Sequence, residues 1–386
     1  MKPVQSFLFS AGIVIFFFTM LEVGIRLSGF ESAIQYGSYS IPAWMEEMDP
    51  VILERYKKFV AGQGFVNEDA YAYERDLRYG FKLKSNLNLA VRNYSSALMV
   101  DKLPVWKIYS DSEGFRTSSI GKTSSKQIKR TLFVMGDSSS FGWGVDFEKS
   151  YPSLLIERLN KAGQQFSLKN LSIPGFSSFQ GRLLLQELDD VKEGDWVVLS
   201  YGWNDSYPSL QTDLQHYQSR NTWWRKMSWI LRHIKLYSWL RSRLNTFYPP
   251  LSMDKKILES RVSIEDYRKN LESSVFDIKA KGAKPILVSV CNISKYRNQM
   301  REVAVSQSVK FLNFPAMFEP YLSTVHDRFP DLFVTYFEAY GKNMEDNPML
   351  AFLFPDRCHP NEIGHDLMAQ ALFKTLRNKF FKDFGP

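Results

Sequence analysis

The first pattern along the chain is a run of uncharged, mostly apolar residues near its start. Residues 3–21 read PVQSFLFSAGIVIFFFTML, about the length that a helix needs to cross a bilayer. Glu22 and Arg26 follow at a spacing of four residues, which allows them to pair at the membrane edge. No small-x-small cleavage site follows the run, so the pattern favours a retained anchor over a cleaved signal peptide or a buried core helix.

The chain from residue 30 to residue 125 shows weaker patterns. Stretches at 87–91 and 105–109 alternate in the way of short strands, and 116–129 is polar, basic and rich in Ser and Thr, as in a loop. We therefore expect an anchor at 1–29, a small β-containing module or collar at 30–125, and a catalytic domain at 126–386.

From residue 131 onward, short apolar runs alternate with helical patterns. Runs of this length are typical of strands that are buried on both faces. They lie at 131–135, 169–172, 196–200, 285–290 and 309–313, with helical patterns at 151–162, 178–192 and 264–281 and a final helix from about Pro360 or Asn361. This alternation predicts a parallel sheet covered on both sides, with ligands bound at the carboxyl ends of its strands.

Composition and charge narrow the function. Hydrophobic residues make up 44% of the 386 residues and the formal net charge is +8, which fits a globular protein. No zinc-finger spacing, RNP-like motif or long basic run is present, so we expect no nucleic-acid partner. Cys291 and Cys358 are the two cysteines; a disulfide and two unpaired buried thiols are both open, and residue type favours the unpaired thiols.

Four polar blocks carry candidate chemistry. Three of them follow predicted strands and the fourth precedes the final helix. They are GDSSSFG at 136–142, IPGFS at 173–177, GWND at 202–205 and DRCHP at 356–360. The first three therefore lie where an α/β protein binds its ligand.

These blocks contain the groups that acyl transfer needs. A serine hydroxyl requires an adjacent base, which His359 can supply, and Asp356 can orient that base from the same turn. The oxyanion needs donors, for which the Ser138 N–H, the Gly175 N–H and the Asn204 amide are the candidates. We expect no metal and no organic cofactor.

The four blocks resemble those of the SGNH hydrolases, also called GDSL esterases, over about residues 131–206 and 261–377. The resemblance implies a flavodoxin-like three-layer α/β/α sandwich, with Ser138 as nucleophile, Asp356 and His359 as its partners, and Gly175 and Asn204 as oxyanion donors. The segments 79–86 and 111–116 also resemble the lead-in of membrane-anchored bacterial members. Ser139 departs from the usual Leu of the first block, and a long insertion at 206–260 separates the third block from the rest.

Other polar residues have simpler interpretations. Asp205 is expected to be a structural partner, and His365 a structural residue of the final helix. No metal-ligand spacing links the other histidines, so none of them is assigned to a site. They are His216, His233 and His326.

The segment 216–248 within the insertion is basic and rich in aromatic residues. It reads HYQSRNTWWRKMSWILRHIKLYSWLRSRLNTFY, which predicts one or two amphipathic helices. Such helices lie on anionic membranes, or they cover a catalytic site as a lid. We regard both as open, and the lid as the simpler.

The sequence therefore predicts a membrane-anchored serine esterase that acts outside the cytoplasm, because a single N-terminal span usually places the following chain there. Its substrate would be an O-acyl ester, acetyl or longer, on a glycan or a lipid. An O-acyltransferase that modifies cell-surface polysaccharide shares the same first half-reaction. A non-catalytic envelope binding protein on the same fold is the further alternative.

Overall fold

The computed structural model describes most of the chain. The described residues are 3–31, 54, 71–92, 105–118, 130–220, 222–231, 233–247, 259–291, 293–340, 342–354 and 358–383.

An eight-stranded sheet forms the centre of the molecule, in the order β12-β11-β8-β6-β7-β5-β4-β3. Its strands, in chain order, are β3 (Asn88–Arg92), β4 (Val105–Ser110), β5 (Arg116–Thr117), β6 (Arg130–Gly136), β7 (Phe166–Asn170), β8 (Trp196–Ser200), β11 (Lys284–Ser289) and β12 (Lys310–Asn313). The pairs β12–β11, β11–β8, β8–β6 and β6–β7 are parallel. Read from β7, this is the 2-1-3-4-5 order of flavodoxin-like proteins, so the predicted fold class is confirmed.

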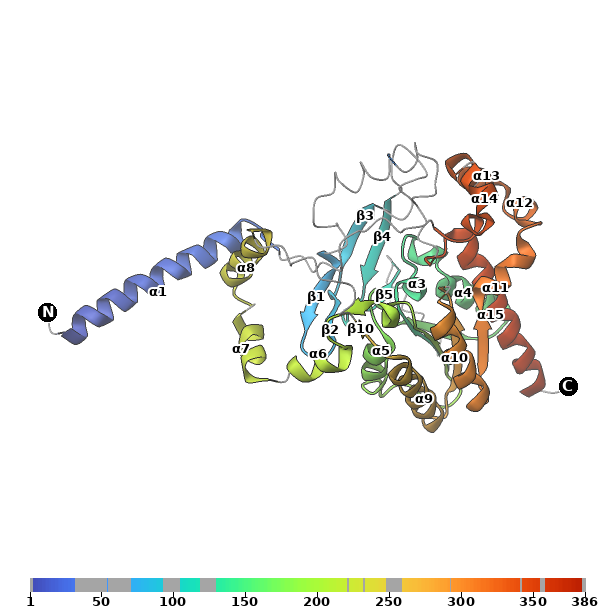
Figure 1. The fold of residues 1–386 in the computed structure, drawn as a ribbon, viewed down its shortest axis with the longest axis horizontal. Helices are drawn as coiled ribbons and strands as arrows, with labels where there is room; N and C mark the ends of the chain where they lie inside the picture. Colours follow the sequence, from blue (N-terminus) through green and yellow to red (C-terminus); the bar gives the residue numbers. More distant parts are fainter. Residues whose placement is uncertain are drawn as a thin grey trace.

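The strands are buried on both faces because helices cover both. Along β6, Leu132 and Val134 belong to one apolar core, whereas Phe133 and Met135 belong to the other, as the two-residue period of a strand requires. The first core includes side chains of α4 (Tyr151–Lys161) and α15 (Glu362–Asp383). The second includes side chains of α5 (Ser178–Leu185), α9 (Ile264–Ala280) and α10 (Ser294–Ser306). The result is a three-layer α/β/α arrangement (Figure 1).

The helical patterns at 151–162 and 264–281 correspond to α4 and α9, but the pattern at 178–192 was too long. Helix α5 ends at Leu185. The residues beyond it include Asp189 and Asp190, and carboxylates near the negative end of a helix dipole are unfavourable. The apolar spacing alone did not show this.

The strands predicted at 87–91 and 105–109 correspond to β3 and β4, and with β5 they extend the central sheet. Strand β5 pairs antiparallel with β7 through Arg116 and Asn170. Ahead of them, β1 (Tyr73–Asp76) and β2 (Gly80–Leu83) form an antiparallel hairpin. The division of the chain into separate domains stays a prediction.

Smaller elements complete the fold. They are α3 (Ser138–Phe141), α11 (Phe314–Phe318), α12 (Val325–Arg328), α13 (Pro330–Tyr340) and α14 (Lys342–Asp346), with short 3₁₀ turns at Phe147–Lys149, Asn204–Ser206, Glu319–Tyr321 and Pro348–Ala351.

The N-terminal helix α1 (Pro3–Leu27) extends away from the rest of the molecule (Figure 1). It is long and apolar enough to cross a membrane, and signal sequences share this length and composition. Glu22 and Arg26 form the expected ion pair, with an N–O distance of 2.7 Å.

The insertion begins and ends at one short ladder, formed by β9 (Pro208–Ser209) and β10 (Glu259–Ser260). Between them lie α6 (Asp213–Arg220), α7 (Trp223–Leu231) and α8 (Lys235–Phe247). In Figure 1, α8 lies at the end of α1 and α7 lies below α8; α8 packs against α1.

The start of α15 depends on a glycine. A Cβ at Gly364 would stand 2.2 Å from the backbone oxygen of Phe352, an atom that cannot rotate away. We expect Gly364→Ala to lower the free energy of unfolding by about 1–3 kcal/mol through overpacking, measured by urea denaturation. Lys374→Ala, at an exposed position of the same helix, is the control. Equal stability of the two variants would contradict the close contact.

Candidate active site

The predicted nucleophile lies at the turn between β6 and α3. Strand β6 ends at Gly136, and the Asp137 carboxylate then accepts a hydrogen bond from the Ser139 N–H at 2.9 Å, which caps α3. The helix ends at Gly142, whose φ of 83° is left-handed and therefore suits glycine. Ser138 is thereby fixed at the first position of the helix, with 8% of its surface exposed.

The structure brings Ser138 and His359 together. The distance from Ser138 Oγ to His359 Nε2 is 2.7 Å, within hydrogen-bond range. The two residues are 221 positions apart, so the contact is made by the fold. A neutral imidazole at this distance can take the serine proton.

Backbone bonds hold the His359 loop. The His359 carbonyl accepts from the Phe354 N–H at 2.8 Å, and Leu353 pairs with Pro360 in an antiparallel bridge. Asn361, which sequence reasoning did not assign to the site, is fully buried. Its side chain caps α15 by accepting from the Gly364 N–H at 3.1 Å. The sequence does indicate this role, because Asn is a favoured residue at the position just before a helix.

A disulfide joins Cys291 and Cys358, whose Cα atoms are 4.5 Å apart. The sequence left this pairing open and favoured unpaired thiols. Cys291 follows β11 and Cys358 precedes His359, so the bond attaches the histidine loop to the sheet. Ser139 Oγ lies 3.3 Å from the sulfur of Cys291 and 3.4 Å from that of Cys358. The disulfide therefore contacts the residue next to the predicted nucleophile.

The third predicted member of the triad, Asp356, lies outside the described residues. Its role as the partner of His359 stays a prediction. The Trp143 ring is a neighbour of the imidazole: its centroid lies 6.1 Å from that of the His359 ring. Trp143 is nearly buried and limits the space available to the imidazole.

Gly175 and Asn204, two of the three predicted oxyanion donors, are each held by a hydrogen bond. Gly175 has a left-handed φ of 85°, and its carbonyl accepts from Arg261 Nη1 at 2.9 Å. Arg261 also forms an ion pair with Asp213 at 2.9 Å. The Asn204 amide donates to the Phe176 carbonyl at 3.0 Å, which uses one of its two N–H donors. Both assignments as oxyanion donors stay predictions.

Comparison with known proteins identifies the family. The model of the GDSL-like lipase/acylhydrolase family matches residues 134–367, more than half of the chain. The chain belongs to this family.

Individual proteins are similar to parts of this chain. An arylesterase of Vibrio mimicus is 37% identical over 83 residues, which cover 22% of this chain and 42% of that protein; the chain therefore matches less than half of that relative's length. Among solved structures, a catalytic mutant of an acetylxylan esterase from Geobacillus stearothermophilus is 17% identical with a TM-score of 0.37, covering 63% of this chain and 92% of that one. A lipase/acylhydrolase from Enterococcus faecalis is 14% identical with a TM-score of 0.37, and the match covers 65% of this chain and 96% of that one.

Two buried carboxyl groups flank the GDSL-like site. Burial raises the pKa of Asp137 to about 6, against the hydrogen bond from the Ser139 N–H and the nearby His359, which lower it. Burial also raises the pKa of Asp205 to about 7, although Ser178 donates to it from both its hydroxyl and its N–H. Asp205 therefore joins the third block to the start of α5, directly after the second block.

Arg116, a residue that sequence reasoning placed in a loop, supports the GDSL-like site from β5. It is 3% exposed and donates to the carbonyls of Phe141, Gly142 and Val145 just after the nucleophile. Burial lowers its pKa to about 9, so it remains charged at neutral pH. Carbonyls at the end of a helix are suitable partners for a cation.

The remaining histidines lie away from the GDSL-like site or serve the core. His365 is fully buried and its Nδ1 accepts from the Tyr151 N–H at 3.2 Å; burial lowers its pKa to about 3, so it is neutral. His216, His233 and His326 are exposed. Among the described residues, no three His, Cys, Asp or Glu side chains gather as a metal site would require.

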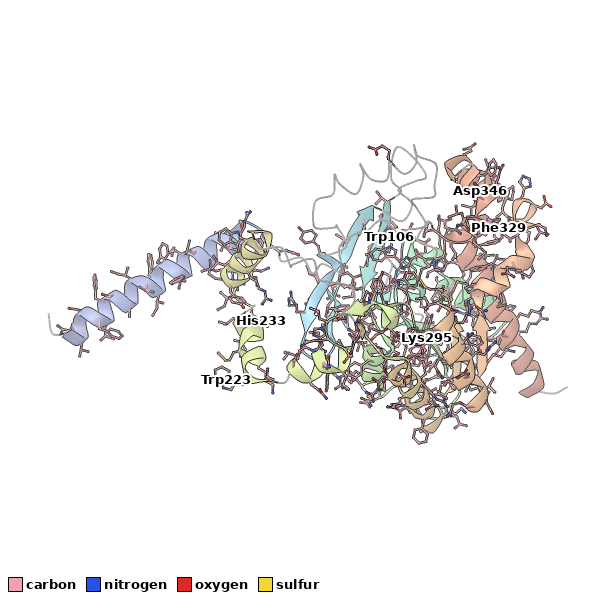
Figure 2. The ribbon with its side chains drawn as sticks, in the orientation of Figure 1. Trp106, Trp223, His233, Lys295, Phe329 and Asp346 are labelled. Carbon is pink, nitrogen blue, oxygen red and sulfur yellow. A yellow bond between two sulfur atoms is a disulfide. The ribbon has the colours of Figure 1, made fainter. Side chains whose placement is uncertain are left out.

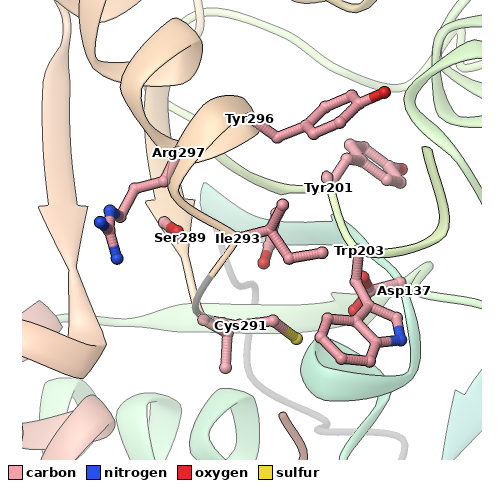
Figure 3. Close-up of a pocket in the computed structure, with 11 residues that line it drawn as sticks. Asp137, Tyr201, Trp203, Ser289, Cys291, Ile293, Tyr296 and Arg297 are labelled. Carbon is pink, nitrogen blue, oxygen red and sulfur yellow. The ribbon is translucent and has the colours of Figure 1, made fainter. Parts of the chain in front are cut away.

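A small cleft opens beside Asp137, lined by residues of the first and third blocks and of the segment after β11. Figure 3 shows the sulfur of Cys291 directed toward the Trp203 ring, with Ile293 between them and Tyr201, and with Arg297 directed away. The cleft thus borders the first and third blocks and the disulfide.

The raised pKa of Asp205 predicts a pH effect on stability. The ordinary value is 3.8 and the folded value about 7, so between these pH values the folded protein holds a proton that the unfolded chain releases. Stability from this group therefore falls as pH rises through that window, by about 1.4 kcal/mol for each pH unit within it. Urea denaturation at several pH values should show the wild type losing stability relative to Asp205→Asn from pH 4 to 7. A constant difference would show that Asp205 is not buried as described.

The disulfide predicts a dependence of activity on redox state. In the Cys291→Ser/Cys358→Ser variant the His359 loop loses its covalent attachment to β11, and misplacement of a base by about 1 Å can cost on the order of a hundredfold in rate. We expect kcat to fall about ten- to a hundredfold and the free energy of unfolding to fall by about 2–5 kcal/mol. Assays of the variant, and of the wild type after reduction, check this. Full activity of a folded, fully reduced protein would contradict it.

Proposed function

We propose that this GDSL-like enzyme is a serine esterase in which Ser138 is the nucleophile, His359 its base and Asp356 the carboxylate that orients the base. The observation that carries the proposal is the 2.7 Å distance between Ser138 Oγ and His359 Nε2. The serine is nearly buried, and the imidazole is backed by a disulfide, a backbone bridge and the Trp143 ring.

The reaction follows from these groups. Ser138 Oγ attacks the acyl carbonyl of the ester while His359 Nε2 takes the hydroxyl proton. The tetrahedral intermediate collapses, the C–O bond to the alcohol breaks, and the imidazolium returns its proton to the leaving alcohol. Water, deprotonated by His359, then attacks the acyl-enzyme and releases the carboxylic acid and free Ser138.

The oxyanion of the intermediate would be stabilised by the N–H groups of Ser138 and Gly175 and by the Asn204 amide. Among the described residues, no group accepts a hydrogen bond from the Gly175 N–H, so this donor is open to a ligand. Arg261 fixes the same loop through the Gly175 carbonyl. Donors held in place before the reaction are the most effective ones.

The substrate class and the location belong to the same proposal. An O-acyl ester on a glycan or a lipid fits the ester chemistry named for the relatives, an arylesterase and an acetylxylan esterase. Helix α1 would anchor the chain in a membrane, with the catalytic domain outside the cytoplasm. The Cys291–Cys358 disulfide supports that side, since disulfides persist in oxidising compartments.

Substitutions in the triad test this function. We expect Ser138→Ala and His359→Ala each to lower kcat on the order of a million-fold, and Asp356→Asn on the order of ten-thousand-fold, because the three groups act as a unit. The measurement is release of acid from a panel of acetyl and longer acyl esters, with and without a sugar acceptor. Ser153→Ala and His326→Ala, which lie outside the site, are the controls.

Ester turnover in Ser138→Ala at the level of the controls would overturn the proposal. Transfer of the acyl group to the sugar, in place of release as acid, would identify an acyltransferase that uses the same nucleophile. A folded wild type with no turnover on any ester would favour a binding role for the fold.

A further inference from the structure

Helix α7 of the insertion carries an apolar stripe that is exposed to solvent. Four large apolar side chains of α7 fall at spacings of four, three and one residues, the spacing of a single helical face, and a fifth, Ile234, follows just beyond the end of the helix. They are Trp223, Met227, Ile230, Leu231 and Ile234, with exposures of 61%, 44%, 55%, 38% and 41%. A stripe of this kind on the surface marks a contact with a partner.

The stripe is fixed beside the end of α1. The Glu22 carboxylate accepts hydrogen bonds from the N–H groups of Lys235 and Leu236 at 2.9 and 2.7 Å and so caps the first turn of α8. Arg26 donates to the His233 carbonyl at 3.1 Å. The end of α7 is therefore held at the level at which the apolar helix ends.

The orientation of α7 suits a surface at that level. Figure 1 shows α7 crossing the direction of α1. Figure 2 shows Trp223 on the side of α7 toward which α1 extends, away from the catalytic domain. If α1 crosses a bilayer, α7 runs along the face of that bilayer and Trp223 points toward it.

The charge of the segment fits the same surface. Residues 216–248 contain seven Lys and Arg residues and no Asp or Glu, whereas the whole chain carries a formal net charge of +8. Most of the excess positive charge of the chain is thus carried by the segment that contains α7. Basic helices with an apolar face bind the interface of anionic membranes.

We propose that α7 lies in the interface of an anionic lipid bilayer, with the stripe of Trp223, Met227, Ile230, Leu231 and Ile234 among the lipids. The inference rests on the proposed membrane anchoring by α1. The bilayer thus contacts the protein at two places, α1 and α7, and the tilt of the catalytic domain is set by both.

This attachment bears on the active site through the insertion. The segment that carries α7 leaves and rejoins the domain at the β9–β10 ladder, where Arg261 holds the Gly175 loop. The insertion therefore sets the distance between the bilayer and the active site. An acyl ester at the membrane surface would reach the active site at a fixed distance from the bilayer.

Nitroxide labels on the full-length chain test the proposal. Ile230→Cys carries the label on the stripe; the native cysteines are already joined as a disulfide. Phe16→Cys in α1 reports the anchor, and Phe276→Cys, 69% exposed on α9, is the matched control on the catalytic domain. Each protein is reconstituted in vesicles of phosphatidylethanolamine and phosphatidylglycerol, and label accessibility is measured to oxygen, which enters lipid, and to a nickel chelate, which stays in water.

We expect the oxygen-to-nickel ratio at position 230 to exceed that at position 276 severalfold, and to fall when phosphatidylcholine replaces both lipids. Water exposure at 230 together with lipid exposure at 16 overturns this inference and leaves the anchor intact. Shielding of 230 from both reagents shows that protein covers the stripe, as a lid or second copy would, and also overturns it. Water exposure at both positions overturns the anchor and this inference together.

Discussion

The hydrogen bond between Ser138 and His359 is the contact on which the rest of the site depends. It joins the end of a strand to a loop that lies 221 residues later. The local structure around either residue is therefore not enough to bring the two side chains together. The protein holds each side independently. The Asp137 cap and Arg116 fix α3, while the Cys291–Cys358 bond and the Asn361 cap fix the loop. A base at hydrogen-bond distance needs this rigidity, because reactivity falls steeply with misplacement.

The sequence predicted the parts of this arrangement that local patterns specify. Apolar runs in the sequence indicate the buried strands. Ser138 and His359 lie in polar blocks whose order along the chain resembles that of the GDSL esterases. The patterns could not show that β3, β4 and β5 extend the central sheet, since strand pairing over long separations depends on contacts that no local window contains. For the same reason local patterns leave the pairing of Cys291 with Cys358 open and indicate a loop at Arg116, although this residue is 3% exposed.

The buried polar groups around the site show why such residues are difficult to recognise. Removing a charge from water costs several kcal/mol unless partners replace the solvent. The structure supplies those partners from distant segments: three carbonyls for Arg116 and Ser178 for Asp205. Arg116 joins β5 to the turn after the nucleophile, and Asp205 joins the third block to the start of α5. The polar residues therefore specify the relative positions of elements that the apolar core alone would leave adjustable.

The link between α1 and the insertion follows the same logic at the surface. The first N–H groups of any helix lack partners within that helix, and Glu22 satisfies two of them in α8. A carboxylate at this position also interacts favourably with the positive end of the helix dipole. Glu22 pairs with Arg26 within α1, and it caps α8 only where α8 begins beside that part of α1. Because this cap joins the two helices, the insertion and the apolar helix behave as one attachment unit, and its position relative to the sheet is set at the β9–β10 ladder.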